Sequence, residues 1–276
     1  MIIIPADVPQ NKIALFKKNY LTVTKGTERF FLFTGDQKLE RLALVSPDAL
    51  FTIAASPFIG AFAAHLGLIA RYGKLYPTCN FIAKLNGKSG LVPQSQKDPI
   101  SKALWSVDDA IACAEDAQLS LCGVGYTVYL GSEFESDMLK EAAQIVHQAH
   151  QNGLLAVLWM YPRGKAIAND LDGTLIAGAA SAACCLGADF VKIKAPHATE
   201  THTVPELLQM VVAAAGNTKV LCAGGEKQNP ENFLTELRSY LEIGGISGCA
   251  IGRNVYENDP EQSLVMAKTI STLVYR

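Results

Sequence analysis

Two lysines, Lys192 and Lys194, lie near the end of the apolar segment Gly187-Ala-Asp-Phe-Val-Lys-Ile-Lys194, which has the composition of a short buried strand. Side chains alternate between the two faces of a strand, so both lysines point to one face. The small-residue segment 177–187 before it is typical of a helix packed on a sheet. Burial lowers the pKa of a lysine and makes its amine a nucleophile. The spacing indicates a Schiff-base lysine but does not decide between the two, and solvated strand-end lysines are the alternative.

An alternation of strands and helices would bring these lysines into a buried site. Short apolar runs typical of buried strands are expected at residues 30–36, 49–54, 80–86, 123–130, 154–161, 187–194, 219–223 and 248–251. Helical segments separate most of them, one with Ser106 as its N-cap and one with Pro205 just inside its start. The pattern predicts an α/β fold, a single (β/α)8 TIM barrel at residues 29–276, with an N-terminal extension at residues 1–28.

In this fold the carboxyl ends of the strands form the active site. Polar and aromatic residues collect at nearly every predicted strand end, which a structural protein would not need. They are Asp36, Lys84 with Asn86, Tyr126 with Tyr129, Trp159 with Tyr161, Lys192 with Lys194, Gly224-Gly225 and Gly252-Arg253. Tyr126 and Tyr129 fall on opposite faces of their strand, so at most one of them can line the site.

The glycines at the last two strand ends predict a phosphate site. Gly224, Gly225 and Gly252 would let backbone N–H groups approach an anion, and the following helices would offer their N-termini. Arg253 adds a fork-shaped donor, and phosphate sites after strands seven and eight recur in this fold. Tight strand-to-helix turns without a ligand are the alternative.

Proton carriers are expected around the carbonyl of a phosphosugar that faces Lys192. Tyr161, one strand earlier, can exchange a proton with the carbinolamine or with a substrate hydroxyl. Asp36, on the first strand, is a second acid/base candidate or a plain turn residue. Trp159 shares the strand face of Tyr161 and is either a wall of the pocket or a core aromatic. Lys84 would bind a second phosphate or pair with a carboxylate inside the barrel.

Composition excludes several other classes of function. The 276 residues carry a net charge of −2, which gives no electrostatic case for nucleic acid or an anionic membrane. Seven cysteines without a Cys-x-x-Cys pair favour reduced thiols in a cytoplasmic protein. The longest apolar stretch, residues 50–70, is interrupted by proline and glycine and suits buried elements better than a membrane span. His147 and His150 lack a third ligand, so no metal is predicted, and both are expected on a solvated helix face.

Several segments together resemble the archaeal-type class I fructose-bisphosphate aldolases, which belong with the deoxyribose-phosphate aldolase superfamily. The resemblance covers roughly residue 30 to the C-terminus. Its motifs are, in order, Gly123-Val-Gly-Tyr-Thr-Val-Tyr129, Trp159-Met-Tyr-Pro-Arg-Gly164, Gly187-Ala-Asp-Phe-Val-Lys-Ile-Lys194, Ala223-Gly-Gly225 and Ile251-Gly-Arg-Asn-Val255.

The resemblance implies a Schiff-base aldolase that needs no metal or other cofactor and converts fructose 1,6-bisphosphate into dihydroxyacetone phosphate and glyceraldehyde 3-phosphate. It implies that Lys192, rather than Lys194, forms the imine. Tyr161 matches the general acid/base, Asp36 the acid of strand one and Trp159 the pocket aromatic. The matches to the phosphate clamp are Gly225, Gly252 and Arg253. Lys194, on the same strand face, is expected to depress the pKa of Lys192 by like-charge repulsion. A homo-oligomeric enzyme of glycolysis and gluconeogenesis is also implied.

Two departures from the family pattern leave alternatives open. Thr34-Gly-Asp-Gln-Lys38 stands where members often carry Asp-His-Gly, and Ala223 stands where a serine commonly precedes the paired glycines. One alternative is a lysine-dependent transferase or thiolase-like enzyme acting on another phosphorylated ketone. The other is a barrel that binds a phosphorylated ligand without turnover.

Overall fold

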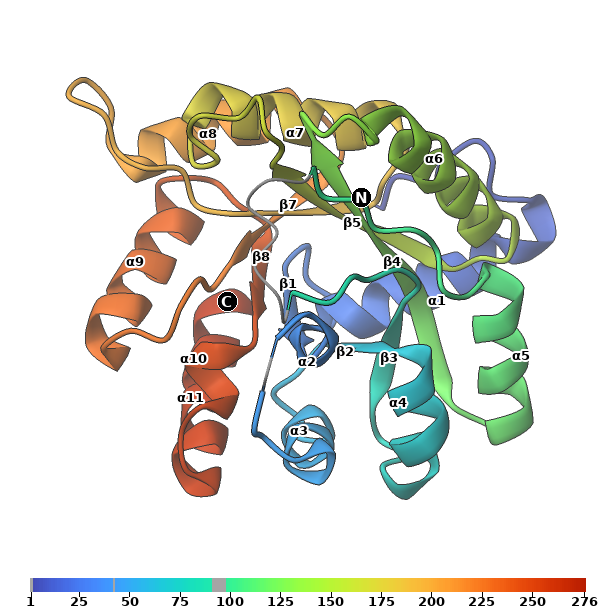
Figure 1. Ribbon diagram of the computed structural model, residues 1–276. Helices are drawn as coiled ribbons and strands as arrows, with labels where there is room; N and C mark the ends of the chain where they lie inside the picture. Colours follow the sequence, from blue (N-terminus) through green and yellow to red (C-terminus); the bar gives the residue numbers. More distant parts are fainter. Residues whose placement is uncertain (1, 42, 91–97) are drawn as a thin grey trace.

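The computed structural model describes residues 2–41, 43–90 and 98–276. Its strands form a closed barrel in which each strand is parallel to the next along the chain and β8 pairs with β1 (Figure 1). The strands are β1 (Phe30–Thr34), β2 (Ala61–His65), β3 (Asn80–Lys84), β4 (Ser120–Leu130), β5 (Leu155–Pro162), β6 (Phe190–Ile193), β7 (Lys219–Ala223) and β8 (Gly248–Ile251). The predicted TIM barrel is confirmed.

Helices surround the barrel and shield the outward faces of its strands. The longer ones that follow strands are α4 (Leu66–Tyr72), α5 (Val107–Ala117), α6 (Glu135–Gln151), α7 (Gly173–Cys185), α8 (Val204–Ala215), α9 (Pro230–Glu242) and α11 (Pro260–Val274). Two short helices, α2 (Gln37–Glu40) and α10 (Arg253–Tyr256), begin directly after β1 and β8. Ser106 caps α5 in a capping box with Asp109, as its position predicts. Within the described residues, none of the helices has the length and apolarity needed to cross a membrane.

Residues 49–54 were predicted to form the second strand, and this prediction is wrong. They belong to α3 (Pro47–Ala54), and the second strand follows at Ala61–His65. The Ser46 hydroxyl accepts a hydrogen bond from the N–H of Ala49 at 3.1 Å and so caps the helix, whose first position is a proline. A short apolar run does not by itself distinguish a strand from a buried helix. β2 is rich in alanine and lacks the β-branched residues that mark strands, so pairing with β1 and β3 determines its conformation.

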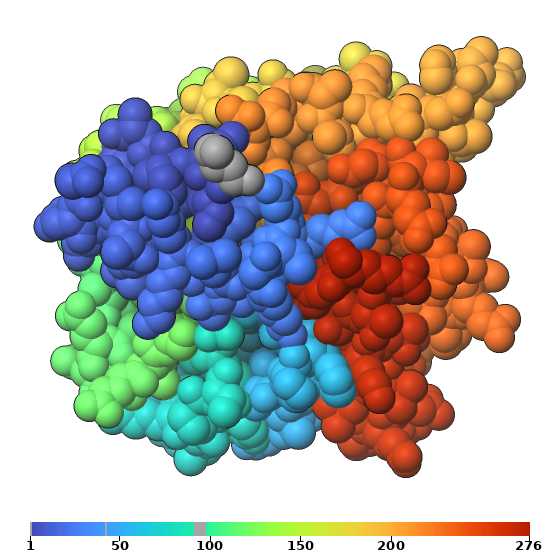
Figure 2. Space-filling view, turned by 180° about the vertical axis from the view of Figure 1, so that it is seen from behind, coloured from blue at the N-terminus to red at the C-terminus, as the bar shows by residue number. Residues whose placement is uncertain are grey.

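The N-terminal extension closes the amino end of the barrel. Its helix, α1 (Ile13–Thr24), follows the 3-10 turn η1 (Gln10–Lys12). Tyr20 stacks on Phe190, the first residue of β6, with ring centroids 5.7 Å apart. α1 runs behind the strands in Figure 1, and Figure 2 shows the blue N-terminal residues spread over that face. The opposite, carboxyl end of the barrel is the end at which the site is predicted.

One histidine ties this extension to the barrel. His150 of α6 lies between two carboxylates, with Nδ1 2.8 Å from Asp7 Oδ1 and Nε2 3.2 Å from Asp189 Oδ2. Its side chain is 1% exposed, so the expectation of a solvated face is wrong for His150. His147 is 61% exposed, and its Nδ1 lies 3.2 Å from Asp7 Oδ2. The contact could not be read from α6 alone, because its partners lie far away in the sequence.

Candidate active site

The alternation within β6 points Lys192 into the barrel. Phe190 and Lys192 face inward, and Val191 and Ile193 pack against the helices outside. Lys192 is 4% exposed. Its neighbour in register on β5 is Trp159, and Lys192 Nζ lies 5.3 Å from the centroid of the Trp159 ring. The amine thus lies in a buried site next to an aromatic face.

Burial lowers the pKa of Lys192 below its ordinary value of 10.5. The carboxylates of Asp36 and Glu40 oppose this shift, and the positive charge of Arg253 adds to it. Lys194 is not among the main charges that shift this pKa, and it forms an ion pair with Asp170, with Nζ 2.5 Å from Oδ2. That Lys194 depresses the pKa of Lys192 therefore stays a prediction.

A second buried lysine lies against the same tryptophan. Lys84, at the end of β3, is 1% exposed, and its Nζ is 5.2 Å from the centroid of the Trp159 ring. Its ammonium donates to Asn86 Oδ1 at 2.6 Å and to the carbonyl of Asn86 at 2.8 Å. Burial lowers the pKa of Lys84 to about 8, against the opposing charges of Asp36 and Glu40. Lys84 thus lies inside the barrel, hydrogen-bonded to Asn86 and influenced by the charges of two carboxylates.

Two carboxylates that follow β1, those of Asp36 and Glu40, act through their charge on both buried lysines. Asp36 is 3% exposed, and its Oδ1 has no hydrogen-bond partner among the described residues. Burial and the charge of Asp36 raise the pKa of Glu40, while Lys84, Lys192 and Arg163 oppose the increase. Glu40 was not predicted from the sequence. Its spacing of four residues from Asp36 was the available signal, because residues i and i+4 share one face once a helix forms.

Tyr161 lies at the end of β5, beside Tyr129 of β4 in register. Burial, the carboxylates of Asp36 and Glu40, and Tyr129 raise the pKa of Tyr161 well above 10.0. The phenol therefore keeps its proton at neutral pH and can donate it. Arg163, also missed by the sequence analysis, lies over the ring of Tyr129 at 5.7 Å.

Of the two tyrosines of β4, Tyr129 faces the site. Tyr126 points outward, and its hydroxyl donates to the carboxylate of Glu141 on α6. The prediction that at most one of them lines the site is therefore confirmed. Gly125, directly before Tyr126, makes room for an aromatic side chain, because a Cβ there would collide with the ring of Trp159.

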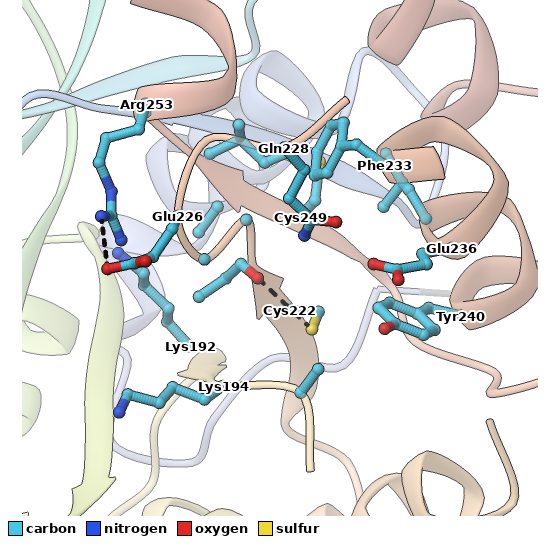
Figure 3. A pocket seen from close by; sticks show the side chains of 18 of the residues that line it. Lys192, Lys194, Cys222, Glu226, Gln228, Phe233, Glu236, Tyr240, Cys249 and Arg253 are labelled. Atoms are coloured by element: carbon cyan, nitrogen blue, oxygen red, sulfur yellow. Dashed lines mark hydrogen bonds and ion pairs between the residues drawn. The ribbon is translucent and has the colours of Figure 1, made fainter. Parts of the chain in front are cut away.

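A cavity of about 820 Å³ opens at the carboxyl ends of β6, β7 and β8. It brings together six of the predicted site residues, which are Lys192, Lys194, Gly224, Gly225, Gly252 and Arg253. Figure 3 shows the two lysines and Arg253 on one side of the cavity, and Cys222, Glu236 and Tyr240 on the other. The other four, Asp36, Lys84, Trp159 and Tyr161, are not among the described residues that line the cavity. Asp36, Lys84 and Trp159 are buried, and Tyr161 is partly buried.

Arg253 and the glycines form the polar end of this cavity. Gly225 has a φ of +66°, a conformation that favours glycine, and a Cβ there would meet open space. The guanidinium of Arg253 pairs with the carboxylate of Glu226, with Nη1 3.4 Å from Oε1. The side chain of Glu226 is 88% exposed, so an anion that enters the cavity can take its place on Arg253. This carboxylate was not expected from the sequence.

Comparisons with known proteins agree with this geometry. The chain matches the DeoC/LacD family of aldolases over residues 29–258. It is 42% identical to the fructose-bisphosphate aldolase/6-deoxy-5-ketofructose 1-phosphate synthase of Methanocaldococcus jannaschii, over 97% of this chain and 88% of that protein. It is 35% identical to the class 1 fructose-bisphosphate aldolase of Halobacterium salinarum, over 79% of this chain and 77% of that protein.

Solved structures give the same picture. A fructose-bisphosphate aldolase from Slackia heliotrinireducens superimposes with a TM-score of 0.96 at 42% identity, covering 100% of this chain and 90% of that one. An archaeal fructose-1,6-bisphosphate aldolase, solved with its catalytic lysine covalently bound to the carbinolamine intermediate of the substrate, has a TM-score of 0.79 at 29% identity. That match covers 95% of this chain and 100% of the other.

Proposed function

The chain belongs to the DeoC/LacD family of aldolases, and on this premise we propose that it is a Schiff-base class I aldolase of fructose 1,6-bisphosphate with Lys192 as its nucleophile. The observation that carries the proposal is the position of Lys192. Its amine is buried inside the barrel, its pKa is lowered chiefly by burial, and it borders a cavity with a glycine-rich, arginine-containing end.

Imine formation is the first step. The neutral amine of Lys192 attacks the C2 carbonyl of the substrate and forms a carbinolamine. Tyr161 donates a proton to the carbinolamine hydroxyl, which leaves as water, and the protonated imine remains. The phenol of Tyr161 is protonated at neutral pH when the step begins, and the charge of Arg163 opposes the rise in its pKa and so favours release of the proton.

Bond cleavage follows. A base removes the proton of the C4 hydroxyl, the C3–C4 bond breaks, and its electron pair moves into the imine to give an enamine. Asp36 is the proposed base, because it is buried beside the lysines and its Oδ1 is free of partners among the described residues. Glyceraldehyde 3-phosphate leaves. Protonation of the enamine at C3 and addition of water then release dihydroxyacetone phosphate and restore Lys192.

The glycine-rich end of the cavity is assigned to the phosphate on C1, the one nearer the reacting carbon. Gly224, Gly225 and Gly252 leave the backbone accessible, and Arg253 supplies a bidentate donor. The phosphate would displace Glu226 from Arg253. Lys194, held by Asp170, borders the same cavity and completes its positive lining.

A second activity on the same lysine is favoured by one comparison. The Methanocaldococcus jannaschii relative also carries the name 6-deoxy-5-ketofructose 1-phosphate synthase. Cleavage of that product between C3 and C4 would give dihydroxyacetone phosphate and a three-carbon ketoaldehyde. Its synthesis would therefore use the same enamine, which would add to a different aldehyde. Incubation with fructose 1,6-bisphosphate and methylglyoxal, followed by mass spectrometry of the products, tests this transfer.

Trapping with borohydride tests the main proposal. With fructose 1,6-bisphosphate or dihydroxyacetone phosphate, reduction should leave an adduct on the peptide that contains Lys192. Lys192→Ala should abolish both the adduct and turnover, and Lys194→Ala, the matched control, should retain the adduct. EDTA should leave the activity unchanged. An adduct on Lys194, or none at all from folded wild-type protein, would refute the assignment.

The homo-oligomer and the cytoplasmic location stay predictions, as does the division into an extension and a barrel. Analytical ultracentrifugation of the purified protein at micromolar concentration tests the first. A sedimentation coefficient that corresponds to 29.6 kDa would contradict it.

A further inference from the structure

The loop after β7, residues 224–229, is held by one side chain of α10. Asn254, which is 3% exposed, donates through Nδ2 to the carbonyl of Gly224 at 2.7 Å and to that of Glu226 at 3.0 Å. Its Oδ1 accepts the N–H of Gln228 at 2.9 Å. A single carboxamide thus satisfies three main-chain groups on alternate residues of the loop.

These contacts fix the direction of other groups in the loop. In a trans peptide unit the carbonyl and the N–H that follows it point in opposite directions, and the described residues contain no cis peptide bond. The carbonyl of Gly224 points to Asn254, so the N–H of Gly225 points away from it. The same holds for the carbonyl of Glu226 and the N–H of Lys227. Neither N–H has a hydrogen-bond partner among the described residues.

Both free N–H groups belong to residues that line the cavity. Gly225 and Lys227 are part of its wall, together with Arg253. Asn254 is not among the described residues that line it, and it follows Arg253 directly in the chain. Asn254 therefore joins the loop after β7 to the segment after β8, and these are the two strand ends that carry the phosphate clamp.

We propose that Asn254 is a positioning residue for phosphate binding. It sets the loop so that the N–H groups of Gly225 and Lys227 converge with the guanidinium of Arg253 on one anion. This inference rests on the proposed function, since it concerns the phosphate of the same substrate. Asn254 acts through the loop and does not itself touch the substrate.

Two variants test the inference. Asn254→Ala removes all three hydrogen bonds, and Asn254→Asp keeps the acceptor but loses both donors. Each should raise the KM for fructose 1,6-bisphosphate and the inhibition constant of inorganic phosphate by about tenfold or more, with kcat changed by no more than about threefold. Asn258→Ala is the matched control. The Asn258 amide donates to the carbonyls of Asn254 and Val255 within the same segment, so this variant should leave phosphate affinity unchanged.

A comparison of two ketones separates positioning from general damage. Borohydride trapping at Lys192 should weaken in the Asn254 variants with dihydroxyacetone phosphate but not with dihydroxyacetone, which has no phosphate. Equal losses with both ketones, or unchanged phosphate affinity, would overturn the inference. If wild-type protein gives no adduct at Lys192 with dihydroxyacetone phosphate, the proposed function fails, and the inference fails with it.

If the variants do not fold, a measurement on the wild-type protein still tests the inference. Inorganic phosphate should shift the amide resonances of Gly225 and Lys227 in an NMR titration. Saturating phosphate without any change in these resonances would overturn the inference, whatever the variants do.

Discussion

Trp159 and Lys192 are neighbours in register on β5 and β6, and Lys192 Nζ lies 5.3 Å from the centroid of the tryptophan ring. The electron-rich face of an aromatic ring favours a charged amine, whereas burial favours a neutral one. The same ring lies 5.2 Å from Lys84 Nζ. Trp159 thus stabilises two ammonium groups in a site that otherwise depresses their pKa values.

Trp159→Phe should move the acid limb of the pH profile of kcat/KM to lower pH. Phenylalanine keeps an aromatic wall but attracts a cation less, so the pKa of Lys192 should fall further. A cation–π contact of ~0.5–2 kcal/mol corresponds to at most about 1.5 pH units. Trp105→Phe is the control, because Trp105 lies beside His65. A shift to higher pH, or equal shifts in both variants, would contradict the prediction.

Asp36→Asn should have two separable effects. The carboxylate of Asp36 raises the pKa of Lys192, so its loss should lower that pKa and extend imine trapping to more acidic solution. Loss of the base should reduce kcat by roughly 100-fold or more. Stopped-flow assays and pH-dependent trapping measure the two effects. Glu40→Gln is the comparison. It also removes a charge that raises the pKa of Lys192 but should retain most of kcat, and an equal loss in both variants would argue against Asp36 as the base.

Gly125→Ala, a substitution in the wall of the barrel, should displace the ring of Trp159. The added Cβ would overlap the ring of Trp159, so the ring must move and lose its position against the lysines. We expect a loss of about 1–3 kcal/mol in the free energy of unfolding and slower trapping at Lys192. Gly67→Ala is the matched control. Gly67 lies in α4 with open space around its Cβ position, and alanine there should stabilise the helix. Unchanged stability of Gly125→Ala would show that the ring has more room than the structure indicates.

His150→Gln should make the protein less stable in a pH-dependent way. Burial opposes the charge on His150, but its hydrogen bonds and the charges of Asp189 and Asp7 outweigh burial and raise its pKa above 6.5. A group whose pKa is raised on folding adds stability that is fully present below its unfolded pKa and is lost as the pH rises through the folded pKa. The free energy of unfolding of the variant should therefore be lower than that of the wild type by about 3 kcal/mol or more at pH 6, and by less above the pKa of His150 in the folded protein.

Urea unfolding between about pH 5 and pH 9 measures this difference. His147→Gln removes an exposed partner of the same Asp7 and should cost less than about 1 kcal/mol. If the His150→Gln difference is the same at all pH values, the imidazole does not titrate in this range and the ion pairs are not its source.

Local signals were sufficient for most of the fold. The strands at Lys219–Ala223 and Gly248–Ile251 were predicted with the observed bounds, because glycines follow them directly. The helix expected to have Pro205 just inside its start does begin at Val204. The segment 49–54 failed because its apolar composition suits either a strand or a buried helix. Only the pairing partners of β2, which are distant in the sequence, resolve that ambiguity.

The site was predictable where it coincides with strand ends. Strand alternation placed Lys192 and Lys194 on one face of their strand and Trp159 on the face of Tyr161, but the choice of Lys192 over Lys194 came from the family resemblance alone. Glu40 and Arg163 lie just beyond their strands, and their approach to the lysines depends on how α2 and the loop after β5 fold back. Asn254 appeared only as part of a motif, because its function in the structure arises from carbonyls that lie 28 and 30 residues earlier.

The position of Trp159 also gives this protein an optical reporter. The chain contains two tryptophans, and Trp159 is 1% exposed with both buried lysines beside its ring. Indole emission responds to nearby charge, and the steps at Lys192 change the charge and the occupancy next to the ring. With Trp105 replaced by phenylalanine, the remaining fluorescence would follow imine formation in real time without a label or a coupled assay.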